Sequence, residues 1–299
     1  MAPLALVLFF ALPAAADPPR NPCNAWSGTT ARLPLRECGG IPENALRYAQ
    51  ACIKAFGPGS ANPKLSSAKY VVIADWTVAQ EFTRLYVLEW NQTDPYQSMN
   101  VLRGGLAHGS GNGSTAGETP TQMTDTINSY GTPGGCMRLF GTGAAGQMST
   151  APTMKAYRLD GLEPRNACVK DERGLYFHEY PGRVELRRKD DNVPASGKAR
   201  SFENVELGRN LALGFSNGCV SLNETDFADI SAMNIIPRSG GILFISWDGH
   251  LIPPKGRGAK NACHSATSVV PTPNYYEKVI GENMEAAQKA LFSDPLATP

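Results

Sequence analysis

Short apolar runs separated by polar connectors dominate the chain after residue 40. Three of them, 69–75, 83–90 and 98–107, are rich in β-branched and aromatic residues and follow one another closely. This pattern predicts consecutive strands of an antiparallel sheet. Further strands are expected at three later runs, 153–159, 174–179 and 242–247. Much of the chain is therefore predicted to be β structure.

Apolar residues spaced three or four apart predict helices elsewhere. From Pro42 to Phe56, Leu46, Ala49 and Ile53 form one apolar stripe. A second helix is predicted directly after Asn223, a residue suited to capping, with an inner stripe of Phe227, Ile230 and Met233. A third is expected from 274 to 292.

The amino-terminal segment has the pattern of a secretory signal peptide. It carries no charged side chain over sixteen residues, is apolar from Leu4 to Leu12, and ends in Ala14-Ala15-Ala16 before Asp17. No later run approaches the roughly 20 apolar residues of a transmembrane helix. We expect an exported protein without an integral membrane segment after cleavage.

The charge balance limits the classes of partner. Lys and Arg number 28 against 27 Asp and Glu, a net charge of +1. Nucleic acid is therefore not an expected ligand. Gly (30) and Pro (23) are frequent enough to indicate many turns within a globular protein.

The chain contains seven cysteines. They are Cys23, Cys38, Cys52, Cys136, Cys168, Cys219 and Cys263. In an oxidising compartment an odd number leaves one thiol unpaired, and the sequence does not choose among the possible pairings of the others. No C-x-x-C pair is present, so neither a zinc site nor another metal is expected.

Cys219 lies in the run whose residues are best suited to catalysis, 214–223. The small residues around it allow a ligand to approach the backbone and main-chain N–H groups to face a developing oxyanion. A thiol must lose its proton to react, and a histidine or the N-terminus of the following helix would lower its pKa. The available histidines are His108, His178, His250 and His264.

The run S-N-G-C-V-S-L-N at 216–223 resembles the S-H-G-C-x-R-hydrophobic-N signature of the YkuD-type L,D-transpeptidases, in particular a divergent murein L,D-transpeptidase branch. Upstream segments agree in order: K-Y-V-V-I-A-D-W-T, R-L-Y-V-L-E-W, G-G-L-A-H-G-S-G, I-N-S-Y-G-T-P-G-G and Y-R-L-D-G-L-E-P-R-N. The resemblance covers about Lys69 to Phe244. It implies a mainly β, YkuD-like β-sandwich with peripheral helices.

The resemblance implies the organisation of the chain as well. A signal peptide at 1–16 would precede a Cys-containing arm and helix at 17–65, an L,D-transpeptidase-like catalytic domain at 66–250, and an extension with a helix at 251–299. A charged insert at 183–200 reads as a solvated hairpin or a flap. Disulfides are expected to tie the flanks to the domain.

Carried over by position, Cys219 resembles the nucleophile and His178 the general base, while the N–H groups of Gly218 and Cys219 would form the oxyanion hole. Substrate contact is expected from four further residues, His108, Ser216, Asn217 and Ser221.

Three features depart from the family's main pattern. Asn217 replaces a His, Ser221 replaces an Arg, and the interval from His178 to Cys219 is about twice the usual one because of the charged insert. The first two match the divergent branch. The third suggests a flap over the site.

By the resemblance, the activity is acyl transfer on peptidoglycan tetrapeptide stems through a thioacyl-enzyme, without a cofactor. An acceptor amine gives cross-linking and water gives an L,D-carboxypeptidase. The expected location is the periplasm or the outside of a bacterial cell envelope.

Other interpretations remain open. Cys219 would pair with His250 or His264 in an NlpC- or papain-like peptidase, where Cys precedes His. A catalytically inactive peptidoglycan-binding protein on the same fold would explain the missing His and Arg. Two non-catalytic interpretations also remain: Cys219 could be part of a disulfide, and His108 could be a purely structural turn residue.

Overall fold

The structure is a computed structural model that describes residues 40–79, 82–109, 112, 119–120, 123, 130–148, 153–163, 166–169, 173–180, 200–204, 209–213, 216 and 218–249. In 200–204 and 209–213 it describes the backbone alone. The predictions for the signal peptide, the arm up to residue 39, the charged insert up to residue 199 and the C-terminal helix lie outside the described residues.

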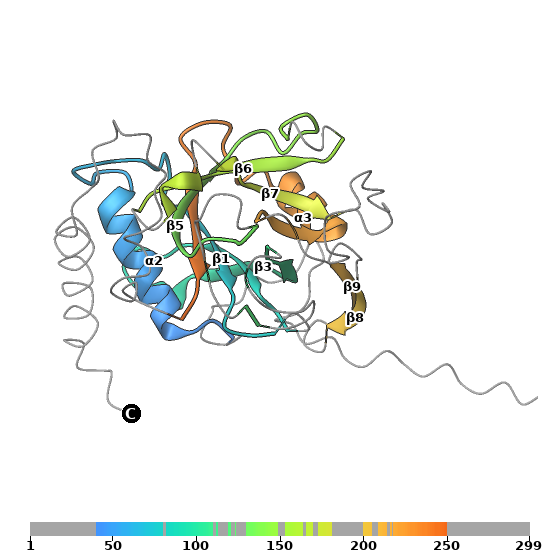
Figure 1. The fold of residues 1–299 in the computed structure, drawn as a ribbon. Helices are drawn as coiled ribbons and strands as arrows, with labels where there is room; N and C mark the ends of the chain where they lie inside the picture. Colours follow the sequence, from blue (N-terminus) through green and yellow to red (C-terminus); the bar gives the residue numbers. More distant parts are fainter. Residues whose placement is uncertain are drawn as a thin grey trace, which may run out of the picture.

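The described elements alternate short strands with a few helical segments (Figure 1). In chain order they are α2 (Glu43–Phe56), β1 (Tyr70–Asp75), β2 (Leu85–Glu89), the short 3-10 helix η1 (Pro95–Gln97), β3 (Met99–Gly104), β4 (Leu106–Ala107), β5 (Gly135–Phe140), β6 (Ala156–Gly161), β7 (Tyr176–Tyr180), β8 (Arg200–Asn204), β9 (Arg209–Leu213), β10 (Val220–Asn223), α3 (Glu224–Met233) and β11 (Ile242–Trp247). The expected mainly β fold with peripheral helices is confirmed.

One sheet of nine strands forms the body of the protein, in the order β3-β2-β1-β11-β5-β6-β7-β10-β4. Its two outermost strands, β3 and β4, are separated in the chain by Gly105 alone. The sheet must therefore bend until its two ends come together. The predicted strand at 98–107 is divided at this glycine.

Both faces of the central strands are covered, which explains the nearly continuous apolar run of β1. Val71 and Ile73 belong to one apolar cluster with residues of α2, while Val72 and Ala74 belong to a second cluster that includes Phe227 of α3. In Figure 1, α2 and α3 lie at opposite sides of the molecule. The alternation of β side chains thus divides the core into two.

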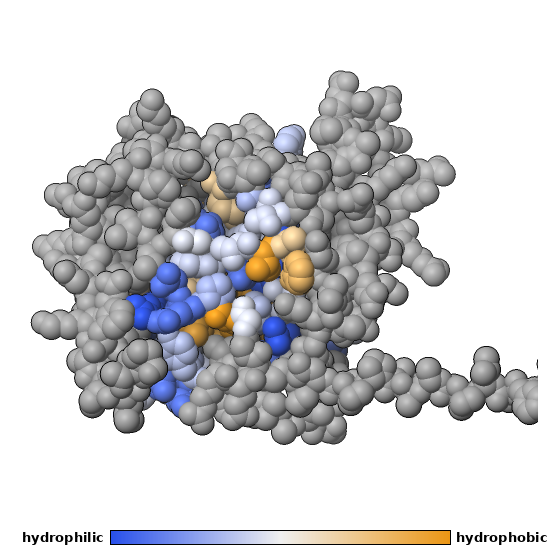
Figure 2. Space-filling model, turned by 90° about the horizontal axis from the view of Figure 1, so that it is seen from below, coloured by the Kyte–Doolittle hydropathy of each residue, from blue (hydrophilic) through white to orange (hydrophobic). Residues whose placement is uncertain are grey.

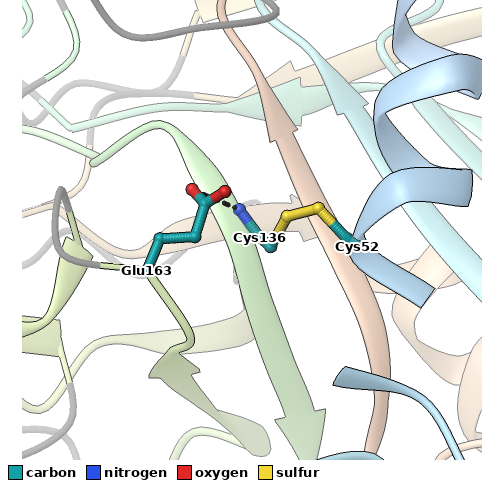
Figure 3. Close-up of side chains that lie close together, drawn as sticks. All are labelled: Cys52, Cys136 and Glu163. Carbon is teal, nitrogen blue, oxygen red and sulfur yellow. Dashed lines mark hydrogen bonds between the residues drawn. A yellow bond between two sulfur atoms is a disulfide. The ribbon is translucent and has the colours of Figure 1, made fainter. Parts of the chain in front are cut away.

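The predicted helix at 42–56 is confirmed, and a disulfide fixes it to the sheet. Cys52 of α2 bonds to Cys136 of β5 across 84 residues. Beside this bond, the Glu163 carboxylate accepts the Cys136 backbone N–H at 3.1 Å (Figure 3) and the hydroxyl of Tyr48. The helix therefore belongs to the same packed unit as the sheet.

Local sequence patterns did not predict two features of the sheet. Strand β5 lies inside 109–150, a segment expected to form loops. Two strand pairs are parallel: β1 with β11, and β7 with β10. The first three strands are antiparallel as predicted.

Neither α2 nor α3, the α-helices of the described chain, combines the length and apolar composition needed to cross a membrane. On the face shown in Figure 2, the described residues place apolar side chains in small groups between hydrophilic ones.

Candidate active site around Cys219

Cys219 lies between Gly218 and the first residue of β10 and is 8% exposed. Among the described cysteines it is the free thiol, since Cys52 and Cys136 are bonded to each other and Cys168 is also disulfide-bonded. The interpretation of Cys219 as half of a disulfide is therefore wrong.

His178 lies on β7, the strand that runs parallel to β10 and pairs with it. Ser221 is opposite His178, and Val220 is opposite Phe177. Partners in a ladder project to the same face, and residues two apart along a strand share a face. If this alternation continues one residue before β10, the side chain of Cys219 shares the face that carries His178.

Small side chains surround the imidazole of His178 in the sheet. Ala156 of β6 pairs with His178, and Ser221 on the other side pairs in turn with Ala107 of β4. His178 is thus the one large side chain in this row of four.

A hydrogen bond defines the tautomer of His178. Its Nδ1 lies 2.7 Å from the backbone carbonyl oxygen of Glu179. A carbonyl oxygen only accepts, so the bond places a proton on Nδ1 and leaves the lone pair on Nε2. In this tautomer Nε2 is the nitrogen able to take a proton from a thiol.

Burial sets the protonation states of both groups. It raises the pKa of the Cys219 thiol to about 11, against a backbone hydrogen bond from Tyr176 and the charge of Arg173, which lower it. Burial lowers the pKa of His178, and its interactions with Glu179 act in the opposite direction. At neutral pH Cys219 is therefore a thiol and His178 a neutral imidazole, the protonation states from which general base catalysis starts.

The expectation that a helix N-terminus activates Cys219 is wrong. Asn223 caps α3 as predicted, with its side chain accepting the Thr225 N–H at 3.0 Å. Strand β10, however, separates Cys219 from the helix. The helix dipole acts only within the first turn, so it does not lower the pKa of this thiol.

The turn before Cys219 requires glycine. Gly218 has φ +101°, a left-handed conformation that residues with a Cβ rarely adopt. A Cβ there would lie 2.6 Å from Nη2 of Arg173 and 2.9 Å from the carbonyl oxygen of Gly131. Gly218 is therefore packed closely on two sides.

One hydroxyl joins this turn to the H-G-S-G segment. Thr132 Oγ1 donates to the Gly218 carbonyl at 3.1 Å and accepts the Gly109 N–H at 2.8 Å. Asn112 holds Thr132 in turn, accepting its N–H at 2.8 Å and donating to its carbonyl at 3.0 Å. Three segments distant in sequence therefore meet immediately before Cys219.

The predicted substrate-contact residues have different environments. The backbone carbonyl of His108 accepts the Ser216 N–H at 3.1 Å, but the His108 imidazole is buried edge-on to Trp76 at 5.9 Å between ring centroids. The Ser216 hydroxyl donates to the Cys219 carbonyl. Asn217 lies outside the described residues, as do His250 and His264. The roles of these residues toward substrate stay predictions.

Ser221 has the most informative environment of this group. Its side chain is completely buried, and among the described residues its Oγ is one of the buried polar atoms without a hydrogen-bond partner. A buried hydroxyl without a partner is unfavourable. It is opposite His178 in the β7–β10 ladder.

Sequence reasoning did not identify three residues of this region. Thr132 lies within the quoted segment I-N-S-Y-G-T-P-G-G but was given no role, and Arg173 lies outside every quoted segment; both contact backbone carbonyls far away in the chain. Tyr130 has φ +55° and a side chain that is 47% exposed, an unusual combination for an aromatic residue. Its carbonyl oxygen lies against Gly109, where a Cβ would approach it to 2.1 Å.

One group of metal-ligand side chains lies within the described part of the chain. Cys52, Cys136 and Glu163 place ligand atoms within 4.8 Å of one another (Figure 3). The two sulfur atoms are bonded to each other, so neither is a thiolate able to bind a metal ion. In the disulfide form this group is structural.

Comparison with known proteins identifies no family for this chain. No family model and no curated protein matches the chain. Among solved structures, the helical cell shape determining protein Pgp2 from Campylobacter jejuni is similar at a TM-score of 0.35 and 10% sequence identity. The similarity covers 69% of this chain and 56% of that one, so the chain spans little more than half of Pgp2.

Proposed function

We propose that the protein is an exported cysteine acyltransferase acting on peptidoglycan stem peptides, an L,D-transpeptidase with Cys219 as nucleophile and His178 as general base. The parallel β7–β10 register supports the proposal most: continued one residue before β10, it aligns Cys219 with the face of His178, whose Nδ1 lies against the Glu179 carbonyl. A thiol beside such an imidazole is suited to acyl transfer.

The resemblance of five ordered segments to the YkuD-type enzymes supplies the substrate class. Support for using it comes from their arrangement, because the segments around His108, Thr132 and Cys219 meet at hydrogen-bond distance. Segments with a merely accidental likeness have no reason to converge on one thiol.

In the first step, Cys219 Sγ attacks the carbonyl carbon of the third residue of a tetrapeptide stem, and its proton passes to Nε2 of His178. The N–H groups of Gly218 and Cys219 are assigned to the oxyanion. Collapse of the tetrahedral intermediate breaks the C–N bond, and the imidazolium returns the proton to the leaving amine of D-alanine. A thioester remains on Cys219.

In the second step, an acceptor amine attacks the thioester and gives its proton to His178, and the C–S bond breaks to restore the thiol. Water in place of the amine gives a shortened stem and makes the enzyme an L,D-carboxypeptidase. The two outcomes share Cys219 and His178, so only the products distinguish them.

Mass spectrometry of the mature protein with a disaccharide-tetrapeptide tests the proposal. We expect loss of D-alanine and a thioacyl adduct on Cys219, no adduct in Cys219→Ala, and a turnover reduced by about 10²–10⁴-fold in His178→Gln. The matched controls are His250→Gln and His264→Gln, which should retain activity. Activity that survives His178→Gln and is lost in a control would instead indicate an NlpC- or papain-like peptidase.

The raised pKa of Cys219 favours a second candidate, a catalytically inactive peptidoglycan-binding protein on the same fold. For this function the muropeptide binds without chemistry, and Cys219→Ala binds as tightly as the wild type. Calorimetric titration of both proteins with the muropeptide distinguishes binding alone from turnover.

A further inference from the structure

Arg173 precedes β7 and reaches the turn that contains Cys219. Its guanidinium donates to the carbonyl of Gly131 and occupies the space beside Gly218, where a Cβ would be 2.6 Å from Nη2. Gly131 directly precedes Thr132, whose hydroxyl donates to the Gly218 carbonyl. The guanidinium is thus held at Gly131, next to the turn before the thiol.

This position gives Arg173 an electrostatic role at the thiol. An arginine stays cationic over the whole working pH range, and its charge acts more strongly where burial reduces screening by water. Arg173 is half-buried and Cys219 is buried. The positive charge of Arg173 lowers the pKa of Cys219, although burial outweighs it. The same charge attracts any anionic group that enters beside Sγ.

A second observation also points to a polar ligand here. The hydroxyl of Ser221 is buried without a partner, two residues beyond Cys219 in the chain and opposite His178 in the β7–β10 ladder. A ligand that fits both features carries negative charge near Arg173 and a hydrogen-bonding group near Ser221. A peptide carboxylate next to its own amide has this chemistry.

We propose that Arg173 is a specificity-determining residue: its charge attracts the free carboxylate that a tetrapeptide stem carries next to the bond that breaks, and favours this donor over a neutral analogue. This inference rests on the proposed acyl transfer for its substrate, but the charge effect of Arg173 on Cys219 is testable without turnover.

The first experiment compares alkylation of Cys219 by iodoacetate, an anion, and by iodoacetamide, its neutral analogue. Mass spectrometry of the folded protein gives the two rates. We expect Arg173→Gln to lower the iodoacetate-to-iodoacetamide rate ratio by about 3–10-fold, Arg173→Lys to preserve most of it, and salt to lower it in the wild type. Equal slowing of both reagents, or a ratio independent of salt, would overturn the proposal.

Arg238→Gln is the matched control. Arg238 is an exposed arginine before β11, and three strands of the sheet separate β11 from β10. Its removal changes the net charge equally and should leave the ratio unchanged. If Arg173→Gln does not fold, Arg173→Lys and the salt dependence of the wild type decide the question.

The second experiment uses a tetrapeptide stem with a C-terminal carboxylate and its carboxamide. Arg173→Gln should raise KM for the carboxylate by about 10-fold or more, with a much smaller change in kcat and little change for the carboxamide. Equal losses on both substrates would contradict a specificity role. If neither substrate is turned over by the wild type, the acyl transfer fails while the alkylation ratio still decides the role of Arg173.

Discussion

The hydroxyl of Thr132 donates to the carbonyl of Gly218 at 3.1 Å, across 86 residues of sequence. Because the same oxygen accepts the Gly109 N–H, one side chain aligns both backbone segments that lead to the candidate nucleophile. The turn before Cys219 is therefore positioned by a residue that has no chemistry of its own in the proposed reaction.

Thr132→Val keeps the shape of the side chain but removes this hydroxyl. It leaves the Gly109 N–H and the Gly218 carbonyl without their partner, so we expect a loss of about 1–3 kcal/mol in unfolding free energy in urea. The rate of thioacyl-enzyme formation should fall as well. Thr132→Ser retains the hydroxyl and is the control; an equal loss in both variants would show that the methyl group matters instead.

Gly218→Ala should destabilise the protein through both backbone strain and steric overlap. The left-handed φ alone costs about 1 kcal/mol or more for alanine, and the Cβ would also overlap the Gly131 carbonyl and Arg173. Gly146→Ala separates the two effects, since Gly146 has φ +88° with open space around it. Thermal unfolding should show a clearly larger loss for Gly218→Ala. Equal losses would contradict the close packing at Gly218.

Stability should fall at alkaline pH because of Cys219. Its pKa is raised by burial from 9.0 to about 11, so the native state retains a proton that the unfolded chain loses in this range. The contribution of Cys219 to the free energy of unfolding is fully present below pH 9 and is lost by about pH 11. It amounts to about 2–3 kcal/mol in total. Urea unfolding of wild type and Cys219→Ser across this range isolates the effect of the thiol, because the tyrosines titrate in both proteins. Parallel curves would contradict the burial of the thiol.

The acid limb of activity should report His178. Burial lowers its pKa from 6.5, so its neutral form, the general base, persists below that pH. We expect kcat/KM to stay level as pH falls through 6.5 and to decline only at lower pH. The free energy of unfolding, by contrast, should begin to fall as the pH drops below about 6.5, because the unfolded chain takes up the proton there and the native protein does so only at lower pH. An acid limb at or above pH 6.5 would mean that His178 is less buried than described.

The disulfide between Cys52 and Cys136 should stabilise the fold without taking part in the chemistry. Replacing both cysteines with alanine removes a covalent link that closes a long loop, which typically costs about 2–5 kcal/mol. Cys219 packs in the other apolar cluster, so activity per folded molecule should be retained. The matched measurement is the unfolding free energy of the wild type after chemical reduction of this disulfide. Loss of activity in the folded double mutant would indicate coupling between the two clusters.

The sequence predicted elements whose signal is local. The helix at 42–56 and the strand at 242–247 have a clear apolar period or run, and both formed close to the expected limits. Strand β5 was missed because its segment is rich in glycine, serine and threonine. The parallel pairing of β1 with β11 depends on contacts between residues more than 160 positions apart, such as Val71 and Leu243, so no local period reveals it.

In the candidate site, too, the sequence indicated residues with a local signal and missed those that depend on tertiary contacts. Cys219 and His178 could be proposed from the sequence because they occur in short runs that resemble a known motif, and they lie at and beside the paired strands β10 and β7. Thr132 and Arg173 were not found because a common residue type becomes important only through the carbonyl that it contacts. The pKa of Cys219 was predicted in the wrong direction because burial is a property of the fold.

Strand β11 lies between β1 and β5, in the middle of the sheet order, although it is the last described strand in the chain. Ribosomal synthesis delivers the chain from its amino terminus, so β1 and β5 emerge long before their shared neighbour. Until Trp247 is available, each of them presents an open edge to other chains. The protein therefore needs protection from aggregation while it is incomplete, and fragments ending before Ile242 should not assemble the sheet.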